Sequence, residues 1–472
     1  MFSNFEEARS YIGTHAIRLV DLKFIDLWGR WHDVTLSAQE FDEDTLVSGV
    51  GFDGSSVGLK SVKSGDMALI PDLATGFVDP FSEIGCLSFI CSTVEADSKR
   101  AFRNDPRQIA RRAEETLSST GIADASKWGP EFEFYVFTSA TFENDTHVAS
   151  YRLEASEASW NNPEGGEGNY IPSHGGYHII PPKDKLFDLR SQIAVKLEDA
   201  GIPVKYHHHE VGGAGQCEVE TPLLGLVKAA DSVMMVKYFT KMVAAENGYT
   251  VSFLPKPLFR EAGSGMHFHQ LLTREGKNAF YDAQSANLLS QSALHYIGGL
   301  LKHAPAVMAF TNPTTNSYRR LIPGYEAPVN CFFSSGNRSA AIRIPKYATQ
   351  PEKVRFEFRP PDATCNPYLA EAAMLMAGID GIRNQIDPTA EGFGPIDEDI
   401  FSWTEEKRST IKSLPTSLEE AMRSLEIDHG FLLFNNVFEE FLIQDWIKAK
   451  RAEDCELRMR PHPYEIEKYF DF

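Results

Sequence analysis

This chain of 472 residues lacks the sequence features of several protein classes. It has no stretch of about 18 consecutive apolar residues, so we expect no membrane-spanning helix and no membrane partner. Its first residues are acidic and contain no apolar run, which argues against a signal peptide and predicts a cytoplasmic protein. Its six cysteines are scattered without CxxC spacing, and they give no support for a disulfide framework or a zinc knuckle.

Positive charge is also scarce. The sequence has 46 lysines and arginines against 66 aspartates and glutamates, a formal net charge of -20. Nucleic acids and anionic lipids need a basic surface, so we expect neither as the main partner. The chain has no GxxxxGK[ST] loop and no GxGxxG turn opening a helix, which excludes the P-loop and Rossmann ways of binding a nucleotide.

The distribution of turns and periodic segments predicts two domains, residues 1–104 and 105–472. The first part mixes a helical opening and a turn-rich Gly51–Ser56 segment with short strand-like runs, at Ala16–Asp21, His32–Leu36, Met67–Pro71 and Gly85–Thr93. Asn104 and Asp105 before Pro106 then signal a helix over Arg107–Ser119. The second part alternates strand-like pieces with amphipathic helices, expected at Leu186–Ala200, Gly225–Asn247, Asn287–His303, Tyr368–Asn384, Leu418–Glu426 and Asn436–Glu453.

What the chain does contain is a set of short stretches in which a charged residue or a histidine occupies every second position. They are Glu131–Phe134, Gln216–Glu220, Met266–His269, Ala341–Ile344 and Arg355–Arg359. Successive side chains of a β-strand point to opposite faces, so each stretch would hold its charges on one face and its apolar residues on the other. Metal ligands and phosphate-binding groups dominate the polar face. We interpret these strands as the floor of an acidic site that holds cations.

Six residues form the candidate ligand set for metal ions: Glu131, Glu133, Glu210, Glu218, His267 and Glu357. Five carboxylates and one imidazole are the wrong donors for structural zinc and suit Mg²⁺ or Mn²⁺. Six ligands suffice for two neighbouring ions, which clamp a transferring phosphoryl group. Pairing with surface lysines is the better interpretation of any single glutamate. It fails for Glu131 with Glu133, because like charges beside one another on an apolar strand are costly without cations.

Histidines, glycines and arginines complete the pattern. His207, His208 and His209 precede Glu210 and a Gly212–Gly215 turn, where glycines let the backbone approach an ion or ligand closely. Bidentate guanidinium groups suit phosphate and carboxylate oxygens. Each arginine alone is most simply an ion-pair residue, but beside an acidic cluster the set indicates ATP and a carboxylate substrate. The arginines are Arg320, Arg338, Arg343 and Arg359.

Taken in order, these motifs resemble bacterial type I glutamine synthetase over essentially the whole chain. The matching segments are Gly51–Ser56, Asp66–Pro71, Glu131–Phe134, His207–Glu218, Gly263–His269, Asn316–Pro328, Asn337–Pro345, Arg355–Pro361 and Arg460–Pro463. The resemblance implies an α+β fold, with a small N-terminal β-grasp domain and a catalytic domain whose curved antiparallel sheet forms a half-barrel flanked by helices. It also implies two stacked six-membered rings with active sites between subunits. The reaction would join ammonia to L-glutamate with ATP, through a γ-glutamyl phosphate, giving L-glutamine, ADP and phosphate.

The resemblance also implies a role for each matching residue. One metal ion would be held by Glu133, Glu210 and Glu218, and the other by Glu131, His267 and Glu357. Arg338 and Arg359 would stabilise the transferring phosphoryl group. The ATP phosphates would face His208, His269, Arg343 and Arg355. Glutamate would be held by Arg320 and the Gly263 backbone.

Three further residues would bind the ammonium nucleophile and remove its protons. The resemblance implies that Asp53 of a neighbouring subunit binds ammonium and takes a proton from it, with Tyr177 nearby. Glu326 would close the site and remove the final proton. Ammonium is not nucleophilic, so an anionic pocket must both attract and deprotonate it.

The chain departs from the family pattern at three places. Ala262 replaces a common Asn before the glycines at 263 and 265, which affects a glutamate contact, and Leu271 replaces a common Ser near the nucleotide. Asp399–Ser402 lacks the tyrosine that is adenylylated in some relatives, so we expect no such control. Two alternatives remain: a ligase of the same family that uses a polyamine, and an inactive relative with a structural or regulatory role. Asp53 and Glu326 favour ammonia over a polyamine, and the complete metal set argues against an inactive protein.

Overall fold

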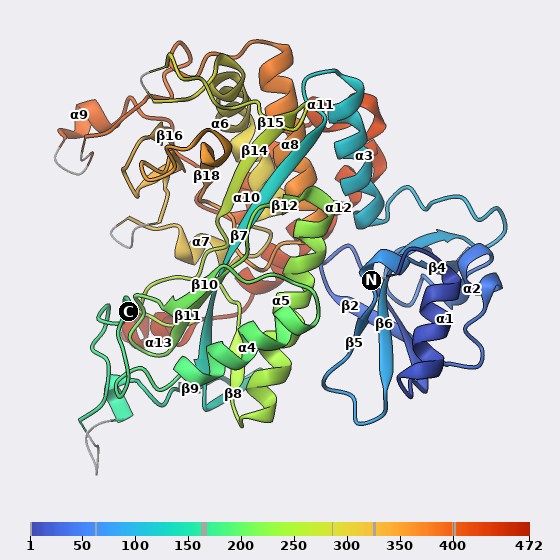
Figure 1. The fold of residues 1–472 in the computed structure, drawn as a ribbon. Coiled ribbons are helices and arrows are strands. Elements are labelled where there is room, and N and C mark those ends of the chain that lie inside the picture. The colour runs from blue at the N-terminus through green and yellow to red at the C-terminus, as the bar shows by residue number, and fades with distance from the viewer. Residues whose placement is uncertain are drawn as a thin grey trace.

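The computed structural model describes residues 2–61, 64–161, 168–285, 287–323, 327–398, 400 and 403–472. It contains two larger sheets that share no strand (Figure 1). A six-stranded sheet belongs to the N-terminal part, and a ten-stranded sheet belongs to the remainder of the chain. Within the described segments, no helix has both the length and the apolar character needed to cross a membrane.

The N-terminal part packs two helices with a mixed sheet of order β2-β1-β6-β4-β3, while β5 pairs with β6. Its elements are α1 (Phe5–Thr14), β1 (Leu19–Ile25), β2 (Trp31–Ser37), α2 (Glu43–Val47), β3 (Val50–Asp53), β4 (Asp66–Pro71), β5 (Phe77–Val78) and β6 (Cys86–Glu95). The central pair β1 and β6 is parallel, and its neighbours are antiparallel. Ala8, Leu22 and Phe89 are fully buried in a small core of their own.

Two local differences from the sequence prediction have clear causes. The first strand begins at Leu19 rather than Ala16, because Ala16 has φ of 54°, a left-handed conformation that no strand accommodates. The turn-rich segment at Gly51 contains a strand, β3, which pairs with β4 from Val50↔Leu69 to Asp53↔Asp66. Glycine and aspartate disfavour strands locally, so only the partner strand reveals this one.

The large sheet has the order β10-β11-β7-β14-β18-β17-β16, with three short strands at its sides. Its strands are β7 (Ala125–Phe137), β10 (Tyr206–His209), β11 (Gln216–Glu220), β12 (Leu224–Gly225), β13 (Thr250–Ser252), β14 (Phe268–Arg274), β15 (Lys277–Asn278), β16 (Asn330–Ser334), β17 (Ala340–Arg343) and β18 (Phe356–Phe358). All pairs along this path are antiparallel except β16 with β17. A separate hairpin, β8 (Ser139–Asp145) with β9 (Val148–Glu154), was not predicted.

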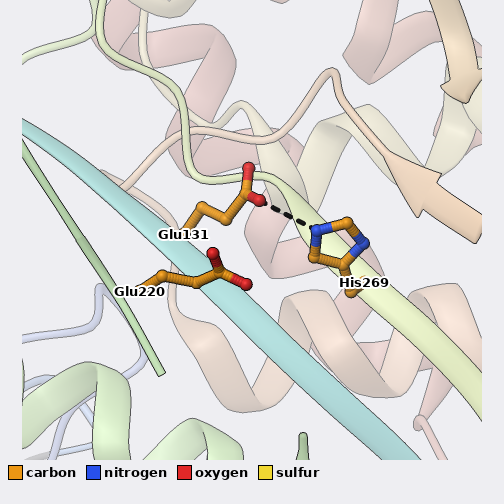
Figure 2. Close-up of side chains that lie close together, drawn as sticks. All are labelled: Glu131, Glu220 and His269. Atoms are coloured by element: carbon orange, nitrogen blue, oxygen red, sulfur yellow. Dashed lines mark hydrogen bonds and ion pairs between the residues drawn. The ribbon is translucent and has the colours of Figure 1, made fainter. Parts of the chain in front are cut away.

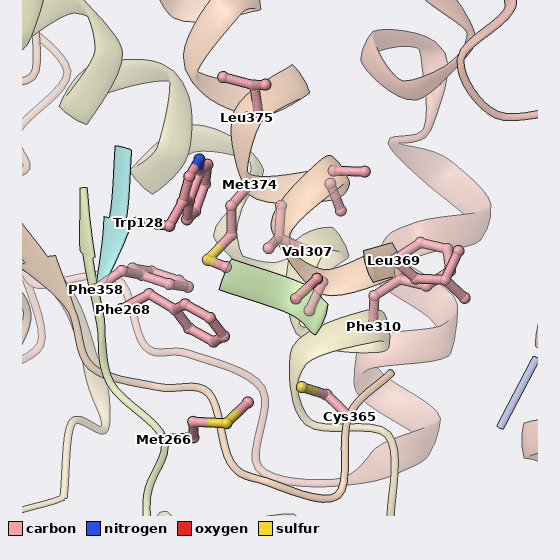
Figure 3. Packing of buried hydrophobic residues seen from close by; sticks show 14 of the residues in the cluster. Trp128, Met266, Phe268, Val307, Phe310, Phe358, Cys365, Leu369, Met374 and Leu375 are labelled. Atoms are coloured by element: carbon pink, nitrogen blue, oxygen red, sulfur yellow. The ribbon is translucent and has the colours of Figure 1, made fainter. Parts of the chain in front are cut away.

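The same part of the chain contains eleven named α-helices among the described residues. They are α3 (Pro106–Ser119), α4 (Phe187–Asp199), α5 (Leu226–Glu246), α6 (Gln291–Thr311), α7 (Ser317–Arg320), α8 (Pro367–Arg383), α9 (Glu405–Arg408), α10 (Leu418–Ile427), α11 (Gly430–Leu433), α12 (Glu440–Arg458) and α13 (Pro463–Tyr469). Of these, α3, α4, α5 and α6 contact strands of this sheet directly. Phe268 and Phe358, from neighbouring strands, lie beside Met374 of α8 in the main core (Figure 3). Burying one face against helices leaves the alternate side chains of the same strands on the other face.

The predicted helices are present with shifted ends. The α6 helix continues through Pro305 to Thr311, eight residues beyond its expected end at His303. The α12 helix begins at Glu440 instead of Asn436, because Asn435 and Asn436 have φ of 53° and 55°, outside the helical region.

Candidate active site

The register of the large sheet gathers the predicted charges on one face. Glu218 of β11 lies opposite His208 of β10 and Glu133 of β7, and Glu220 lies opposite Glu131. The intervening Phe132 and Val219 pair on the other face and are fully buried. The alternation in the sequence therefore becomes a row of carboxylates across adjacent strands.

The centre of this face is a buried cluster of Glu131, His267 and Glu357. One ligand atom from each lies within 4.8 Å of the others. His267 Nδ1 is 3.1 Å from Glu131 Oε2 and 3.3 Å from Glu357 Oε1. The backbone amide of Glu131 also donates a hydrogen bond to the His267 carbonyl, which joins β7 to the segment just before β14. These are the three residues predicted to share one metal ion.

The second predicted ligand set is arranged differently. Glu210 and Glu218 cluster with His208, whose ring nitrogens lie 3.7 Å and 3.6 Å from their carboxylates. Glu133, the third predicted member, accepts a 2.7 Å hydrogen bond from the Gly265 amide instead. His208 was predicted to face ATP phosphates, and its role and that of Glu133 stay predictions.

A third cluster contains a residue to which sequence reasoning gave no role. One carboxylate oxygen of Glu220 lies within 4.8 Å of a carboxylate oxygen of Glu131 and of a ring nitrogen of His269. Figure 2 shows Glu131 reaching toward His269, and His269 Nε2 lies 2.8 Å from Glu131 Oε1. Glu220 Oε1 is 2.5 Å from Lys205 Nζ, while Glu220 Oε2 is buried without a hydrogen-bond partner among the described residues. The alternation of β11 was the available signal, because Glu220 is two residues after Glu218.

The electrostatics of the site fit divalent cations. Burial, followed by the charges of neighbouring glutamates, raises the pKa of Glu218 well above its usual range. Burial also acts to raise the pKa of Glu131, but His269 and His267 outweigh it and hold that pKa well below the usual range. Crowded, buried carboxylates with one orphaned oxygen are the hard donor set that Mg²⁺ or Mn²⁺ requires.

Arginines surround the central cluster. Arg343 Nη2 lies 2.7 Å from Glu357 Oε2, and Arg359 Nη1 lies 2.5 Å from Glu357 Oε1. Arg359 Nε also donates to the Arg338 carbonyl at 3.2 Å, which places Arg338 at the edge of the group. Arg355 is buried, with its guanidinium carbon 5.6 Å from the centre of the Tyr347 ring.

Arg320 and Gly263 lie together beside His267. Arg320 is buried and its Nη2 is 3.1 Å from His267 Nε2. Its Nη1 donates to the Pro360 carbonyl at 2.8 Å, which fixes the direction of the guanidinium. A Cβ at Gly263 would come within 2.6 Å of Arg320 Cγ and 2.7 Å of the Pro255 carbonyl oxygen, so only glycine fits there.

Tyr177 lies at the open side of the site. Its ring is 5.6 Å from that of His208, and its side chain is half exposed. Burial and the Glu210 carboxylate raise the pKa of Tyr177.

The structure of a single chain does not bring Asp53 to this face. It ends β3 in the small sheet, where its carboxylate accepts hydrogen bonds from Ser55 and Ser56. These bonds lower the pKa of Asp53. Glu326 lies outside the described residues, as do three of the four residues of the Asp399–Ser402 segment.

The two departures near the site are both buried. The Ala262 carbonyl accepts a 2.7 Å hydrogen bond from the Tyr135 hydroxyl, while its methyl side chain offers no polar contact. Leu271 lies two residues after His269 on β14, so both side chains point to the same face of the strand.

Comparison with known proteins identifies this arrangement. The model of the glutamine synthetase catalytic domain matches residues 103–469, and that of the glutamine synthetase β-grasp domain matches residues 16–96. The chain belongs to the glutamine synthetase family. Glutamine synthetases of Frankia alni and of Nostoc sp. are 45% and 46% identical to it, over at least 99% of each chain. A glutamine synthetase structure from Plasmodium falciparum superposes with a TM-score of 0.89 at 27% identity, covering 99% of both chains.

Family membership also accounts for the architecture. The small sheet with its helices is a β-grasp domain, and the large curved sheet with its helices is the catalytic half-barrel. The predicted α+β fold is therefore confirmed. The predicted boundary at residue 104 stays a prediction.

Proposed function

We propose that this glutamine synthetase family member is a glutamate–ammonia ligase that forms L-glutamine, ADP and phosphate. The observation that carries the proposal is the buried cluster of Glu131, His267 and Glu357, flanked by Arg343 and Arg359. A cation-binding centre beside fixed guanidinium groups suits phosphoryl transfer from ATP to a carboxylate.

The metal centre would hold Mg²⁺ or Mn²⁺ through the six predicted ligands. One ion would be bound by Glu131, His267 and Glu357, and the other by Glu133, Glu210 and Glu218. Bound there, the ions would supply positive charge to the phosphate oxygens during transfer. Glu220 extends the carboxylate row without a role in this scheme.

The first step would activate the substrate carboxylate. A γ-carboxylate oxygen of glutamate attacks the γ-phosphorus of ATP, the bond to the bridging oxygen breaks, and ADP leaves. Arg359 and Arg338 would stabilise the transferring phosphoryl group. His208, His269, Arg343 and Arg355 would bind the ATP phosphates.

Glutamate itself would be oriented by Arg320 and the Gly263 backbone. Arg320 is held by the Pro360 carbonyl, so its guanidinium needs little reorganisation to meet a carboxylate. Gly263 lets the backbone lie against it without a Cβ.

The second step would use ammonia as the nucleophile. Asp53 of a neighbouring subunit binds ammonium and accepts its proton, with Tyr177 at the same entrance. The ammonia nitrogen then attacks the carbonyl carbon of the acyl phosphate, the bond from this carbon to the phosphate oxygen breaks, phosphate leaves, and Glu326 takes the remaining proton. Keeping water out until ammonia arrives protects the acyl phosphate.

This scheme needs an assembly, which we propose to be two stacked six-membered rings. Asp53 lies in the small sheet, whereas the other described site residues belong to the large domain. The C-terminal segment also exposes several large apolar side chains, at Tyr464, Ile466, Tyr469, Phe470 and Phe472. Contact with another subunit would cover such a surface. We place this assembly in the cytoplasm, where ATP is available and free thiols persist.

Phosphate release by the purified chain with Mg²⁺ and ATP tests the proposal. We expect release to require both glutamate and ammonium. Turnover with putrescine and none with ammonium would identify a polyamine ligase. Phosphate release that ignores glutamate and ammonium, or none at all, would indicate an inactive relative.

A further inference from the structure

The row of paired side chains on the large sheet continues beyond Glu133 and Glu218. The next pair along the same two strands is Gln216 of β11 with Tyr135 of β7. Side chains two residues apart on a strand lie on one face, so this neutral pair continues the face that holds the carboxylates. Both side chains are fully buried. The proposed mechanism gives neither of them a role.

Gln216 uses both ends of its amide to join β11 to two other segments of the site. Its Oε1 accepts a 2.8 Å hydrogen bond from the Gly212 amide, in the turn that follows Glu210. Its Nε2 donates to the Gly263 carbonyl at 3.0 Å and to the Ser264 hydroxyl at 3.2 Å. A buried amide whose donors and acceptor are matched holds its partners in one arrangement, because breaking one of these bonds leaves a buried polar group unsatisfied.

Tyr135 holds the same backbone segment from the neighbouring strand. Its hydroxyl donates to the Ala262 carbonyl at 2.7 Å. The Ser264 amide donates to the Pro255 carbonyl at 2.8 Å. Both peptide units that flank Gly263 therefore contain at least one bonded group. Because a peptide unit is planar, these bonds fix the direction of the whole unit on either side of Gly263.

Close packing leaves this arrangement little freedom. A Cβ on Gly212 would collide with the Tyr135 hydroxyl and would lie 2.7 Å from Gln216 Oε1. On the other side of the pair, Gly263 lies against Arg320. The two polar side chains therefore lie between the turn that carries a predicted metal ligand and the segment proposed to bind glutamate.

The direction of this backbone matters because residue 262 has no polar side chain. Ala262 ends in a methyl group, so residues 262 and 263 can offer glutamate hydrogen bonds from their backbone alone. Backbone groups bind a substrate well when their direction is set before it arrives, since no free energy is then spent on ordering them.

We propose that Tyr135 and Gln216 are positioning residues for the glutamate subsite. They hold the backbone of residues 262–264 in the orientation that binds glutamate beside Arg320. This inference rests on the proposed function, because it takes Arg320 and the Gly263 backbone as the groups that bind glutamate.

Steady-state kinetics of Tyr135→Phe test the proposal, because this change removes one hydroxyl and keeps the ring. We expect KM for glutamate to rise about tenfold, as the loss of one buried hydrogen bond implies. KM for ATP and KM for ammonium should each change less than about twofold. Tyr296→Phe is the matched control, because the Tyr296 hydroxyl is also buried and donates to Gln270 at 3.1 Å in the core. It should keep all three constants.

Gln216→Met is the second variant, because methionine has a similar length and lacks the amide. KM for glutamate should rise at least as much as in Tyr135→Phe, since both the Gly263 carbonyl and the Gly212 turn lose their partner. The change also removes a long contact of 3.5 Å to Glu133 Oε2, so Tyr135→Phe is the cleaner variant. Gln270→Met is its control, because the Gln270 amide is buried in the core, 3.5 Å from Met374 Sδ.

An unchanged KM for glutamate in both site variants would overturn the proposal. A parallel rise in all three constants, or an equal rise in the two controls, would also overturn it, because either result indicates a purely structural role. The wild-type protein separates this inference from the proposed function. If it releases phosphate in response to glutamate and ammonium, only the positioning role is in question. If it does not, the proposed function fails, and calorimetric titration of wild type and variants with glutamate still tests the positioning role.

Discussion

At the scale of single residues, the shared carboxylate of Glu131 is the most informative feature. Its Oε2 faces His267 and its Oε1 faces His269, at 3.1 Å and 2.8 Å. One side chain thereby joins two clusters of potential ligands. Glu357 has a similar position, because one oxygen faces Arg343 and the other faces Arg359.

Replacing Glu357 with glutamine should disable the site without unfolding the protein. The amide removes a predicted metal ligand and leaves the guanidinium groups of Arg343 and Arg359 without their charge partner. We expect phosphate release to fall about 100-fold or more and Mn²⁺ affinity to fall about 10- to 100-fold. Electron paramagnetic resonance of Mn²⁺ measures the second quantity. Glu352→Gln, an exposed change nearby, should match wild type, and normal Mn²⁺ affinity in Glu357→Gln would contradict its proposed role.

Substituting Gly263 with alanine should impair glutamate binding. The new Cβ would displace Arg320, whose Cγ would lie 2.6 Å away. We expect KM for glutamate to rise about 10- to 100-fold while KM for ATP changes less than about twofold. Steady-state kinetics measure both constants. Gly225→Ala is the control, because nothing lies within 4 Å of the added Cβ and its φ of -64° suits alanine. An equal rise in both constants would argue for general distortion.

At the scale of elements, buried polar contacts join helices behind the sheet. His303 of α6 lies between Asp380 of α8, at 3.0 Å, and Asp428 just after α10, at 2.8 Å. Burial acts to lower the pKa of His303, but hydrogen bonds to both aspartates outweigh it and raise that pKa. The protonated imidazole therefore ties three helices together.

This contact should make stability depend on pH with a defined sign. The pKa of His303 is higher in the folded than in the unfolded protein, so its stabilisation is complete below about pH 6.5 and is lost as pH rises through the folded value. His303→Gln should be less stable than wild type by about 1–3 kcal/mol at pH 6, and the difference should shrink at pH 9. Denaturant unfolding at both pH values measures this. A difference that grows with pH would refute the assignment.

At the scale of the whole molecule, the distribution of the predicted catalytic groups matters most. Asp53 is in the β-grasp domain, where its carboxylate accepts hydrogen bonds from Ser55 and Ser56, and the predicted metal ligands lie on or beside strands of the large sheet. The proposed site between subunits would bring these two groups together.

Mixed assemblies of two inactive variants test this arrangement. Asp53→Ala should lose ammonium use but keep ATP binding, and Glu357→Gln should lose phosphoryl transfer. When the two chains are expressed together, roughly a quarter of the sites would combine an intact Asp53 from a Glu357→Gln chain with an intact Glu357 from an Asp53→Ala chain. Activity should therefore return in part. Phosphate release by the mixed assembly, compared with each variant alone, measures it. Absence of recovery in assemblies shown to contain both chains would place Asp53 and Glu357 in the same subunit's site or in separate functions.

By itself, the sequence determined the features that depend on neighbouring residues. Alternation in Glu131–Phe134 and Gln216–Glu220 set which side chains share a face, because the period of a strand is two. The motifs and their order identified the family, and the helices followed from their apolar spacing.

Only the tertiary structure decided which distant residues meet. Pairing of Glu220 with Glu131, and of Val50 with Leu69 in β3, depends on the register of strands far apart in the chain. Two hydrogen bonds of the site also depend on packing between distant segments. Glu133 accepts one from the Gly265 amide, and Arg320 donates one to the Pro360 carbonyl. No local pattern encodes such contacts, because their free energy comes from burial and hydrogen bonding after the chain has folded.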